Sequence, residues 1–307
     1  MVTRLLLSAL RKAMDYRFDG QPQLYYLDET DFGLNAEPFS FRSGKWLLRG
    51  KKYSQAGQKP STLCIFFHGA GAGHSAYMLE IAALVKQGYL VYAYDNTGCM
   101  TSEGRSVGSL AQSLVDQEAF FAYLETQPEK DLPRVAVGHS WGGFTALGAL
   151  KKAYRVSKIV SISGFFCVAD EVVRLAPKFK KFEGAIRKAM DKGYGKYGSG
   201  SLLDEIESSD AEILYIQGEA DNLIAKDTHY DVLMKRFGNH PRVHTVLVEG
   251  AMHNPYWTLE SQKYSVTITK KWRIMQRDYD NHAEIDYGLL NCDEPKVMNA
   301  IFDFLRA

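Results

Sequence analysis

The stretch Val135-Ala136-Val137-Gly138-His139-Ser140-Trp141-Gly142-Gly143-Phe144 decides the fold of this chain. Its first three residues are apolar and rich in β-branched side chains, which is typical of a buried strand. Residues 144–152 favour a helix. The pattern Gly138-x-Ser140-x-Gly142 therefore predicts a tight strand-to-helix turn with Ser140 at its apex. Glycines on both sides allow the strand and the helix to approach without Cβ collisions.

This turn would hold the serine hydroxyl out at the carboxyl edge of a sheet. Backbone N–H groups and the positive end of the following helix would then face any negative charge that develops there. A serine hydroxyl is a poor nucleophile near neutral pH, so it needs a base within hydrogen-bond reach and a partner that orients the base. Both groups must come from elsewhere in the chain.

Strand-like and helix-like runs alternate along most of the sequence. The expected strands are 24–28, 45–53, 63–67, 90–94, 135–137, 158–163, 213–217 and 243–248. The expected helices are 77–87, 109–127, 144–152, 226–237 and 293–305. This alternation predicts a mostly parallel, eight-stranded α/β sheet with helices on both faces, its first two strands antiparallel and near an edge. Sites in such sheets lie at the carboxyl ends of the strands.

The candidate base and acid both follow strands at this edge. His253 comes just after the last expected strand, where it can turn back over the serine. Asp221 comes just after the preceding strand. The order Ser140, Asp221, His253 is the one found in α/β-hydrolases.

The sequence therefore resembles the α/β-hydrolase family over roughly residues 60–305, except for the stretches 165–210 and 254–290. Beyond the serine turn, the resemblance depends on His68-Gly69-x-Gly71, Gly218-x-x-Asp221 and Gly250-x-x-His253. It implies a catalytic triad of Ser140, Asp221 and His253. It also implies that the backbone N–H groups of Trp141 and Ala70 bind the oxyanion, with Gly71 as an alternative to Ala70.

The resemblance also implies how the chain is divided. Residues 1–164 and 211–307 would form the hydrolase core, and 165–210 would form a small helical lid. Gly71, His139 and Tyr256 are candidates for contacting the substrate. The aromatic stretch 256–287 is interpreted as packing first and as pocket wall second.

Composition narrows the function classes. The chain has 307 residues and a formal net charge of +1, without the basic excess of most nucleic-acid-binding proteins. Its four cysteines have no metal-like spacing and favour a reducing, cytoplasmic compartment. The N-terminal apolar run is short and ends at Arg11-Lys12, which indicates an amphipathic helix, not a signal peptide. No run approaches the length of a membrane span.

The resulting hypothesis is a serine hydrolase that cleaves a carboxylic ester of a small-molecule acyl substrate through an acyl-enzyme. It needs no cofactor and no metal. A peptidase, amidase, thioesterase or C–C bond hydrolase on the same triad stays open. A rival from another class is a non-catalytic binding protein on a hydrolase fold.

Overall fold

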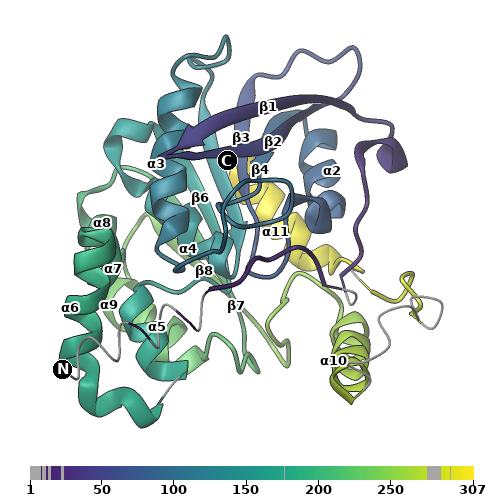
Figure 1. Ribbon diagram of the computed structural model, residues 1–307. Coiled ribbons are helices and arrows are strands. Elements are labelled where there is room, and N and C mark those ends of the chain that lie inside the picture. The colour runs from purple at the N-terminus through teal and green to yellow at the C-terminus, as the bar shows by residue number, and fades with distance from the viewer. Residues whose placement is uncertain are drawn as a thin grey trace.

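The computed structural model describes residues 15–21, 24–175, 177–274, 285–290 and 292–307, together with Ser8 and Lys12. Its strands form an eight-stranded sheet in the order β1-β2-β4-β3-β5-β6-β7-β8 (Figure 1). From β4 to β8 the neighbouring strands are parallel, whereas β1 pairs with β2 and β2 with β4 in antiparallel fashion. The mostly parallel α/β sheet expected from the sequence is confirmed.

Seven of the eight expected strands are present, and one is wrong. The strands are β1 (Asn35–Ser43), β2 (Trp46–Ser54), β3 (Thr62–Phe67), β4 (Tyr89–Tyr94), β5 (Arg134–His139), β6 (Val156–Ile162), β7 (Glu212–Gly218) and β8 (Val243–Val248). Residues 24–28 form no strand, although Leu24, Tyr26 and Leu27 pack against the core. The first strand is instead β1, which forms a long hairpin with β2. Gly44 makes the tight turn possible with its φ of 57°.

Helices separate most of the strands. The α-helices are α2 (Met78–Lys86), α3 (Gln112–Leu124), α4 (Trp141–Leu147), α5 (Val168–Leu175), α6 (Glu183–Tyr194), α7 (Lys196–Ser199), α8 (Leu203–Ser208), α9 (Tyr230–Phe237), α10 (Leu259–Ile274) and α11 (Pro295–Arg306). Short 3₁₀ helices are η1 (Glu29–Phe32), η2 (His74–Tyr77), η3 (Gly148–Leu150), η4 (Lys152–Tyr154), η5 (Pro177–Phe182) and η6 (Lys226–Thr228). The helix expected at 144–152 begins earlier, at Trp141, directly after the serine.

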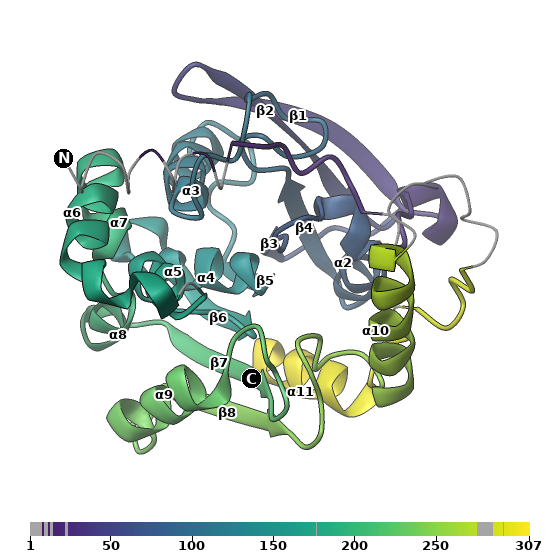
Figure 2. The same cartoon turned by 60° about the horizontal axis from the view of Figure 1, so that its bottom comes forward.

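The sheet is buried on both faces. On one face, the side chains of Leu63, Ile65 and Phe67 pack with α3 and α4. On the other face, Cys64 and Phe66 pack with α2 and α11 (Figure 2). Successive residues of β3 thus enter opposite cores, which explains why this strand is a continuous apolar run.

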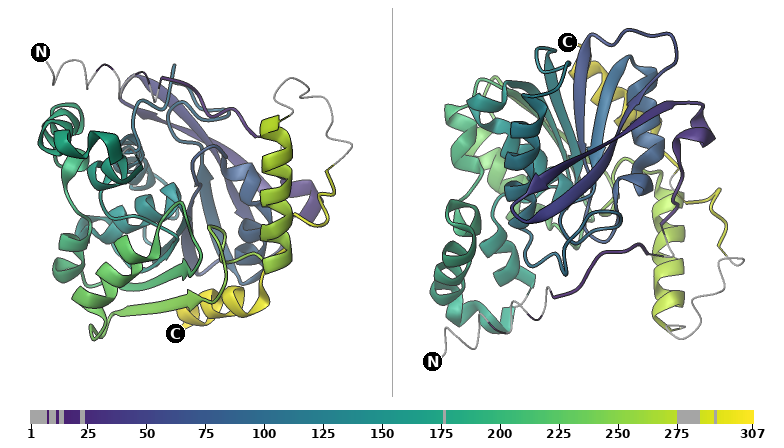
Figure 3. Two further views of the ribbon diagram at one scale, coloured as in Figure 1. Left: turned by 90° about the horizontal axis from the view of Figure 1, so that it is seen from below. Right: turned by 45° about the horizontal axis from the view of Figure 1, so that its top comes forward.

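Two segments depart from the alternation of strands and helices. Helices α5 to α8 come from residues 165–210, and α10 follows β8. They lie on opposite sides of the molecule in every view (Figures 1 and 3). The proposed N-terminal helix falls outside the described residues, apart from Ser8 and Lys12, which are helical. No helix within the described ranges is both long and apolar enough to cross a bilayer.

Candidate active site

Ser140 lies at the apex of the turn between β5 and α4. Its φ of 57° and ψ of −119° are unusual for a residue with a side chain. Its backbone N–H donates to the carbonyl of Ile162, at 2.7 Å, which fastens the turn to β6. A Cβ on Gly138 would lie 2.1 Å from the Gly142 carbonyl oxygen, and one on Gly142 would lie 1.9 Å from that of Phe67. Both glycines are therefore required for the close approach predicted from the sequence.

The three residues of the predicted triad meet at the carboxyl edge of the sheet. His253 Nε2 lies 2.8 Å from Ser140 Oγ, and His253 Nδ1 lies 2.9 Å from Asp221 Oδ2. They come from the ends of β5, β7 and β8, so the parallel strands bring together side chains more than 100 positions apart. The distances are those of a nucleophile, a base and an acid that orients the base.

Asp221 is held as a carboxylate by its surroundings. Burial would raise its pKa, but the hydrogen bond and charge of His253 lower it below the usual value. The backbone N–H groups of Leu223 and Ile224 donate to Oδ1 at 2.8 and 2.9 Å and act in the same direction. Gln217 Nε2 donates to Oδ2 at 3.2 Å. These donors fix the carboxylate so that Oδ2 faces the imidazole.

The loop after β3, residues 68–73, is called the β3 loop below and carries the predicted oxyanion donor Ala70. His68 is fully buried; its Nδ1–H donates to the Gly69 carbonyl at 2.9 Å, and its Nε2 accepts from the Asn96 N–H at 3.0 Å. Its side chain thus supports the β3 loop from within. Ala70 and Ser140 line the same cavity.

Trp141 is the first residue of α4, where backbone N–H groups have no partner within the helix. Its indole is buried and donates to the Leu110 carbonyl at 2.7 Å. The side chain is thus an anchor in the core. Only the backbone N–H of Trp141 is left to serve as the predicted oxyanion donor.

The cavity beside Ser140 has a volume of about 580 Å³. It is lined by Gln21, Leu24, Gly69, Ala70, Ala72, Ala76, Tyr77, His139, Ser140, Leu223, Met252, His253, Asn254, Tyr256, Trp257, Gln262, Ser265, Val266, Thr269 and Lys270. Five of these residues belong to α10, which forms one wall. This helix lies within the stretch 256–287, which was interpreted from its aromatic residues as packing and pocket wall. Its own lining residues are not aromatic, and their recurrence at helical spacing is the signal that could have revealed them.

Of the three residues predicted to contact the substrate, two line the cavity and Gly71 does not. His139 and Tyr256 line the cavity, but they are only 4% and 2% exposed. Both ring nitrogens of His139 are already engaged by Tyr77 and by the His253 carbonyl. Gly71 is buried behind Gln21, whose side chain occupies the space where a Cβ would stand. The structure therefore places Gln21, not Gly71, at the cavity wall.

The segment 165–210 contributes no residue to this lining among the described residues. In the aromatic stretch 256–287, Tyr256 and Trp257 are buried and also line the cavity. These two residues therefore pack in the core and form part of the pocket wall. The side chain of Trp272 and all of Tyr279 lie outside the described residues. No group of three or more His, Cys, Asp or Glu side chains suited to a metal ion occurs in the described part of the chain.

Comparisons with known proteins bear on the fold. Residues 58–198 match the model of the family described as serine aminopeptidase S33. No curated protein matches the sequence. Among solved structures, an esterase from Pyrococcus furiosus is similar at 18% identity and a TM-score of 0.61, over 84% of this chain and 98% of that one.

Two further structures have the same fold. An acylaminoacyl peptidase from Pyrococcus horikoshii is similar at 16% identity and a TM-score of 0.55, over 81% of this chain and 42% of that one. An α/β-hydrolase from Penicillium is similar at 15% identity and a TM-score of 0.54, over 80% and 97%. The chain therefore has the α/β-hydrolase fold.

Proposed function

We propose that the protein cleaves carboxylic esters through an acyl-enzyme formed on Ser140. The observation that carries this proposal is the hydrogen-bonded series Asp221–His253–Ser140, which opens onto a cavity of about 580 Å³. A cavity of this size accommodates a small-molecule substrate. The three residues are the groups that acyl transfer requires: a nucleophile, a base that takes its proton, and a carboxylate that orients the base.

In the proposed reaction, Ser140 Oγ attacks the ester carbonyl carbon while His253 Nε2 takes the hydroxyl proton. The carbonyl oxygen becomes an oxyanion, which the N–H groups of Ala70 and Trp141 stabilise. As the tetrahedral intermediate collapses, His253 returns the proton to the departing alcohol. A water molecule then repeats the sequence with His253 as base, which releases the acid and restores Ser140.

Asp221 has two roles in this proposal. Its carboxylate accepts the Nδ1–H of His253, so that Nε2 carries the free lone pair that faces Ser140. It also stabilises the imidazolium that forms when the serine proton is taken up. The lowered pKa of Asp221 keeps this negative charge in place at neutral pH.

Cleavage of an ester is favoured over cleavage of a peptide with a free amino terminus. Recognition of an ammonium group calls for a carboxylate in the site. No Asp or Glu is among the described residues that line the cavity, where the formal charge comes from Lys270. The similarity to an acylaminoacyl peptidase and to the serine aminopeptidase model keeps peptide and amide cleavage as the alternative.

Two parts of the hypothesis concern mobility and location. We propose that residues 165–210 act as a lid, because they form the helices α5 to α8 beyond the carboxyl end of β6. We also propose that the protein works in the cytoplasm, since its cysteines are unpaired in the described structure.

The test is hydrolysis of p-nitrophenyl esters from acetyl to palmitoyl by the wild type and by Ser140→Ala. The proposal predicts activity on some member of the series, with a loss of several orders of magnitude in the variant. Aminoacyl p-nitroanilides, N-acylated and free, are assayed in parallel. Activity confined to these amides would favour the peptidase. Undiminished ester hydrolysis by Ser140→Ala would contradict the assignment of the nucleophile.

A further inference from the structure

We propose that Tyr77 is a positioning residue whose hydroxyl, through His139, holds the β3 loop, the Ser140 turn and the loop of His253 in mutual register. This inference rests on the proposed function, because it concerns the same three loops. It adds a residue from η2, a segment outside the three catalytic loops, to the machinery of the site.

The argument begins with the contacts of Tyr77. Its hydroxyl accepts a hydrogen bond from the backbone N–H of Gly69 at 3.1 Å. The same hydroxyl lies 2.9 Å from His139 Nδ1. His139 Nε2 in turn lies 2.9 Å from the backbone carbonyl oxygen of His253. Gly69 precedes the oxyanion donor Ala70, and His139 precedes Ser140, so each link ends on or next to a proposed catalytic residue.

The direction of these hydrogen bonds is fixed by chemistry. A carbonyl oxygen only accepts, so the proton of His139 must be on Nε2. Burial and the neighbouring His253 lower the pKa of His139 to about 3, and its ring is therefore neutral. Nδ1 then carries a lone pair and accepts the proton of the Tyr77 hydroxyl. Every donor in the series has one acceptor, and the tautomer of His139 is determined.

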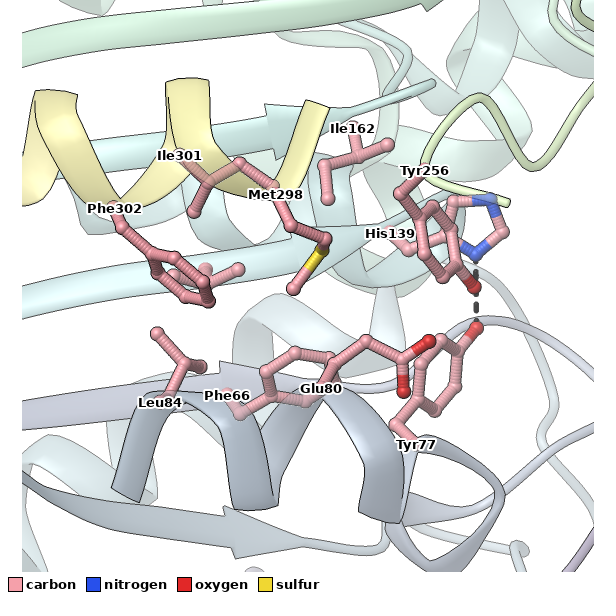
Figure 4. A pocket seen from close by; sticks show the side chains of 11 residues that line it. Phe66, Tyr77, Glu80, Leu84, His139, Ile162, Tyr256, Met298, Ile301 and Phe302 are labelled. Atoms are coloured by element: carbon pink, nitrogen blue, oxygen red, sulfur yellow. Dashed lines mark hydrogen bonds between the residues drawn. The ribbon is translucent and has the colours of Figure 1, made fainter. Parts of the chain in front are cut away.

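The surroundings shield this series of hydrogen bonds from solvent. His139, Tyr77 and Tyr256 are each at most 6% exposed, and they stand at the polar end of a small apolar cavity of about 10 Å³ (Figure 4). The Tyr256 hydroxyl faces that of Tyr77 and interacts with it. In such low-dielectric surroundings, hydrogen bonds are stronger and an unpaired polar group is more costly.

Gly69 provides an independent indication that the contact is built into the fold. A Cβ at this position would lie 2.5 Å from the Tyr77 hydroxyl oxygen. Only glycine therefore lets the phenol reach the backbone of the β3 loop. Gly69 belongs to the motif His68-Gly69-x-Gly71, and its lack of a side chain also leaves room for the Tyr77 hydroxyl.

Removal of the Tyr77 hydroxyl would leave both the Gly69 N–H and His139 Nδ1 without a partner. The β3 loop and the loop of His253 would then be free to shift relative to Ser140. Displacement of catalytic groups by about 1 Å costs roughly 100-fold in rate, whereas substrate binding depends on the whole cavity wall. We therefore expect an effect on kcat and on the stabilisation of the oxyanion, with little change in KM.

The experiment compares Tyr77→Phe with Tyr92→Phe. Tyr92 is a matched control, because it is also buried and its hydroxyl also makes a hydrogen bond, to Glu129, but it does not line the cavity. Three quantities are measured: kcat and KM on p-nitrophenyl butyrate, the rate at which a fluorophosphonate modifies Ser140, and the affinity for a trifluoromethyl ketone. The ketone forms a hemiketal with Ser140 and so reports on oxyanion binding.

For Tyr77→Phe we expect kcat, the fluorophosphonate rate and the ketone affinity each to fall by about 10- to 100-fold, with KM changed less than threefold. Tyr92→Phe should stay within twofold of the wild type in all three. Wild-type values in Tyr77→Phe, or equal losses in both variants, would overturn the inference. A loss confined to KM would also overturn it.

Gly69→Ala is the second variant, in case Tyr77→Phe does not fold. It retains the hydroxyl but displaces it, so the same three losses are expected. The fluorophosphonate rate separates the two proposals. If no ester is hydrolysed but Tyr77→Phe still slows modification of Ser140, the proposed substrate class fails while the positioning role stands.

Discussion

At the scale of single residues, the site depends on Asp221 keeping one orientation and one charge. Its two oxygens have different partners: Oδ1 accepts hydrogen bonds from two backbone N–H groups, and Oδ2 faces His253. Its neighbours thus determine that Nδ1 of His253 faces Asp221 and that Nε2 faces Ser140. A change that preserves shape but removes the charge is the sharpest test of this arrangement.

We predict that Asp221→Asn lowers kcat by about 10³–10⁴-fold with a small effect on folding. An asparagine amide has no charge to stabilise the imidazolium and can present a donor to Nδ1, which favours the wrong tautomer. The measurement is ester hydrolysis together with a thermal unfolding curve. Asp231→Asn is the control, because Asp231 pairs with Lys226 at the surface. A loss below tenfold in Asp221→Asn would contradict the role given to this carboxylate.

At the scale of elements, the turn between β5 and α4 is the most tightly constrained part of the site. Ser140 has a positive φ, and the glycines on either side face backbone oxygens. Backbone atoms of three elements, β3, β5 and α4, meet there. They cannot move apart without loosening the sheet.

We predict that Gly142→Ala destabilises the protein by at least roughly 2 kcal/mol, because its Cβ would stand against the Phe67 carbonyl. Gly193→Ala is the matched control, since Gly193 lies in α6 and nothing lies within 4 Å of its Cβ position. That variant should gain up to about 1 kcal/mol from helix propensity. The free energy of unfolding, measured by urea denaturation, checks both. Equal stabilities would show that the turn tolerates a side chain.

A second constrained element is the junction of α2 with the Trp257–Asp293 bridge. Glu80 is buried there, with Oε2 unpartnered, and Asp293 Oδ1 is buried and also unpartnered. Burial and the neighbouring Asp293 raise the pKa of Glu80 well above its usual value. Burial raises the pKa of Asp293 to about 7. Both groups are therefore more easily protonated in the folded protein than in the unfolded chain.

Because the pKa values are higher in the folded protein than in the unfolded chain, protonation of the two groups stabilises the fold. This contribution to the free energy of unfolding is fully present below about pH 4. It is lost as the pH rises through about 7 and above. We predict that the free energy of unfolding falls over that range, because both groups must give up their protons inside the folded protein. Glu80→Gln should reduce the pH dependence, whereas Glu37→Gln, at an exposed position, should not. Urea denaturation from pH 4 to 9 measures it. An unchanged pH dependence in Glu80→Gln would contradict the prediction.

The sequence predicted most of the fold, but only part of the contacts in the candidate site. Buried strands such as β3 and β4 are continuous apolar runs, so the sheet followed from local pattern. Ser140, Asp221 and His253 each come just after a strand, so their meeting at one edge of the sheet followed as well. The edge strand β1 is partly exposed and was missed, while the apolar residues Leu24 to Leu27 only pack against the core. The link from Tyr77 to His139 joins distant positions through single atoms and leaves no periodicity to detect.

At the scale of the whole molecule, the cavity lies between loops at the carboxyl edge of the sheet and α10. Gln262 donates to the Trp257 carbonyl and accepts from the Met252 N–H, so this end of α10 is fastened beside His253. Lys270 lies about two turns farther along the helix, roughly 12 Å away. The wall of the cavity therefore carries a positive charge at some distance from Ser140.

We predict that this charge favours an acyl chain with a terminal carboxylate. The p-nitrophenyl monoester of decanedioic acid should have a higher kcat/KM than p-nitrophenyl decanoate, by roughly two- to fivefold at low salt, as expected for an exposed ion pair. Lys270→Met should remove the preference. Lys263→Met should retain it, because Lys263 is exposed on α10 but does not line the cavity. A preference that is the same in both variants would contradict this prediction.

The central claim is that His253 and Asp221 make Ser140 the nucleophile. Its most direct test is mass spectrometry after incubation with a fluorophosphonate, for the wild type, Ser140→Ala and His253→Ala. We predict one adduct, located on the peptide that contains Ser140, absent in Ser140→Ala and formed orders of magnitude more slowly in His253→Ala. An adduct at another residue, or no adduct on the folded wild type, would contradict the account.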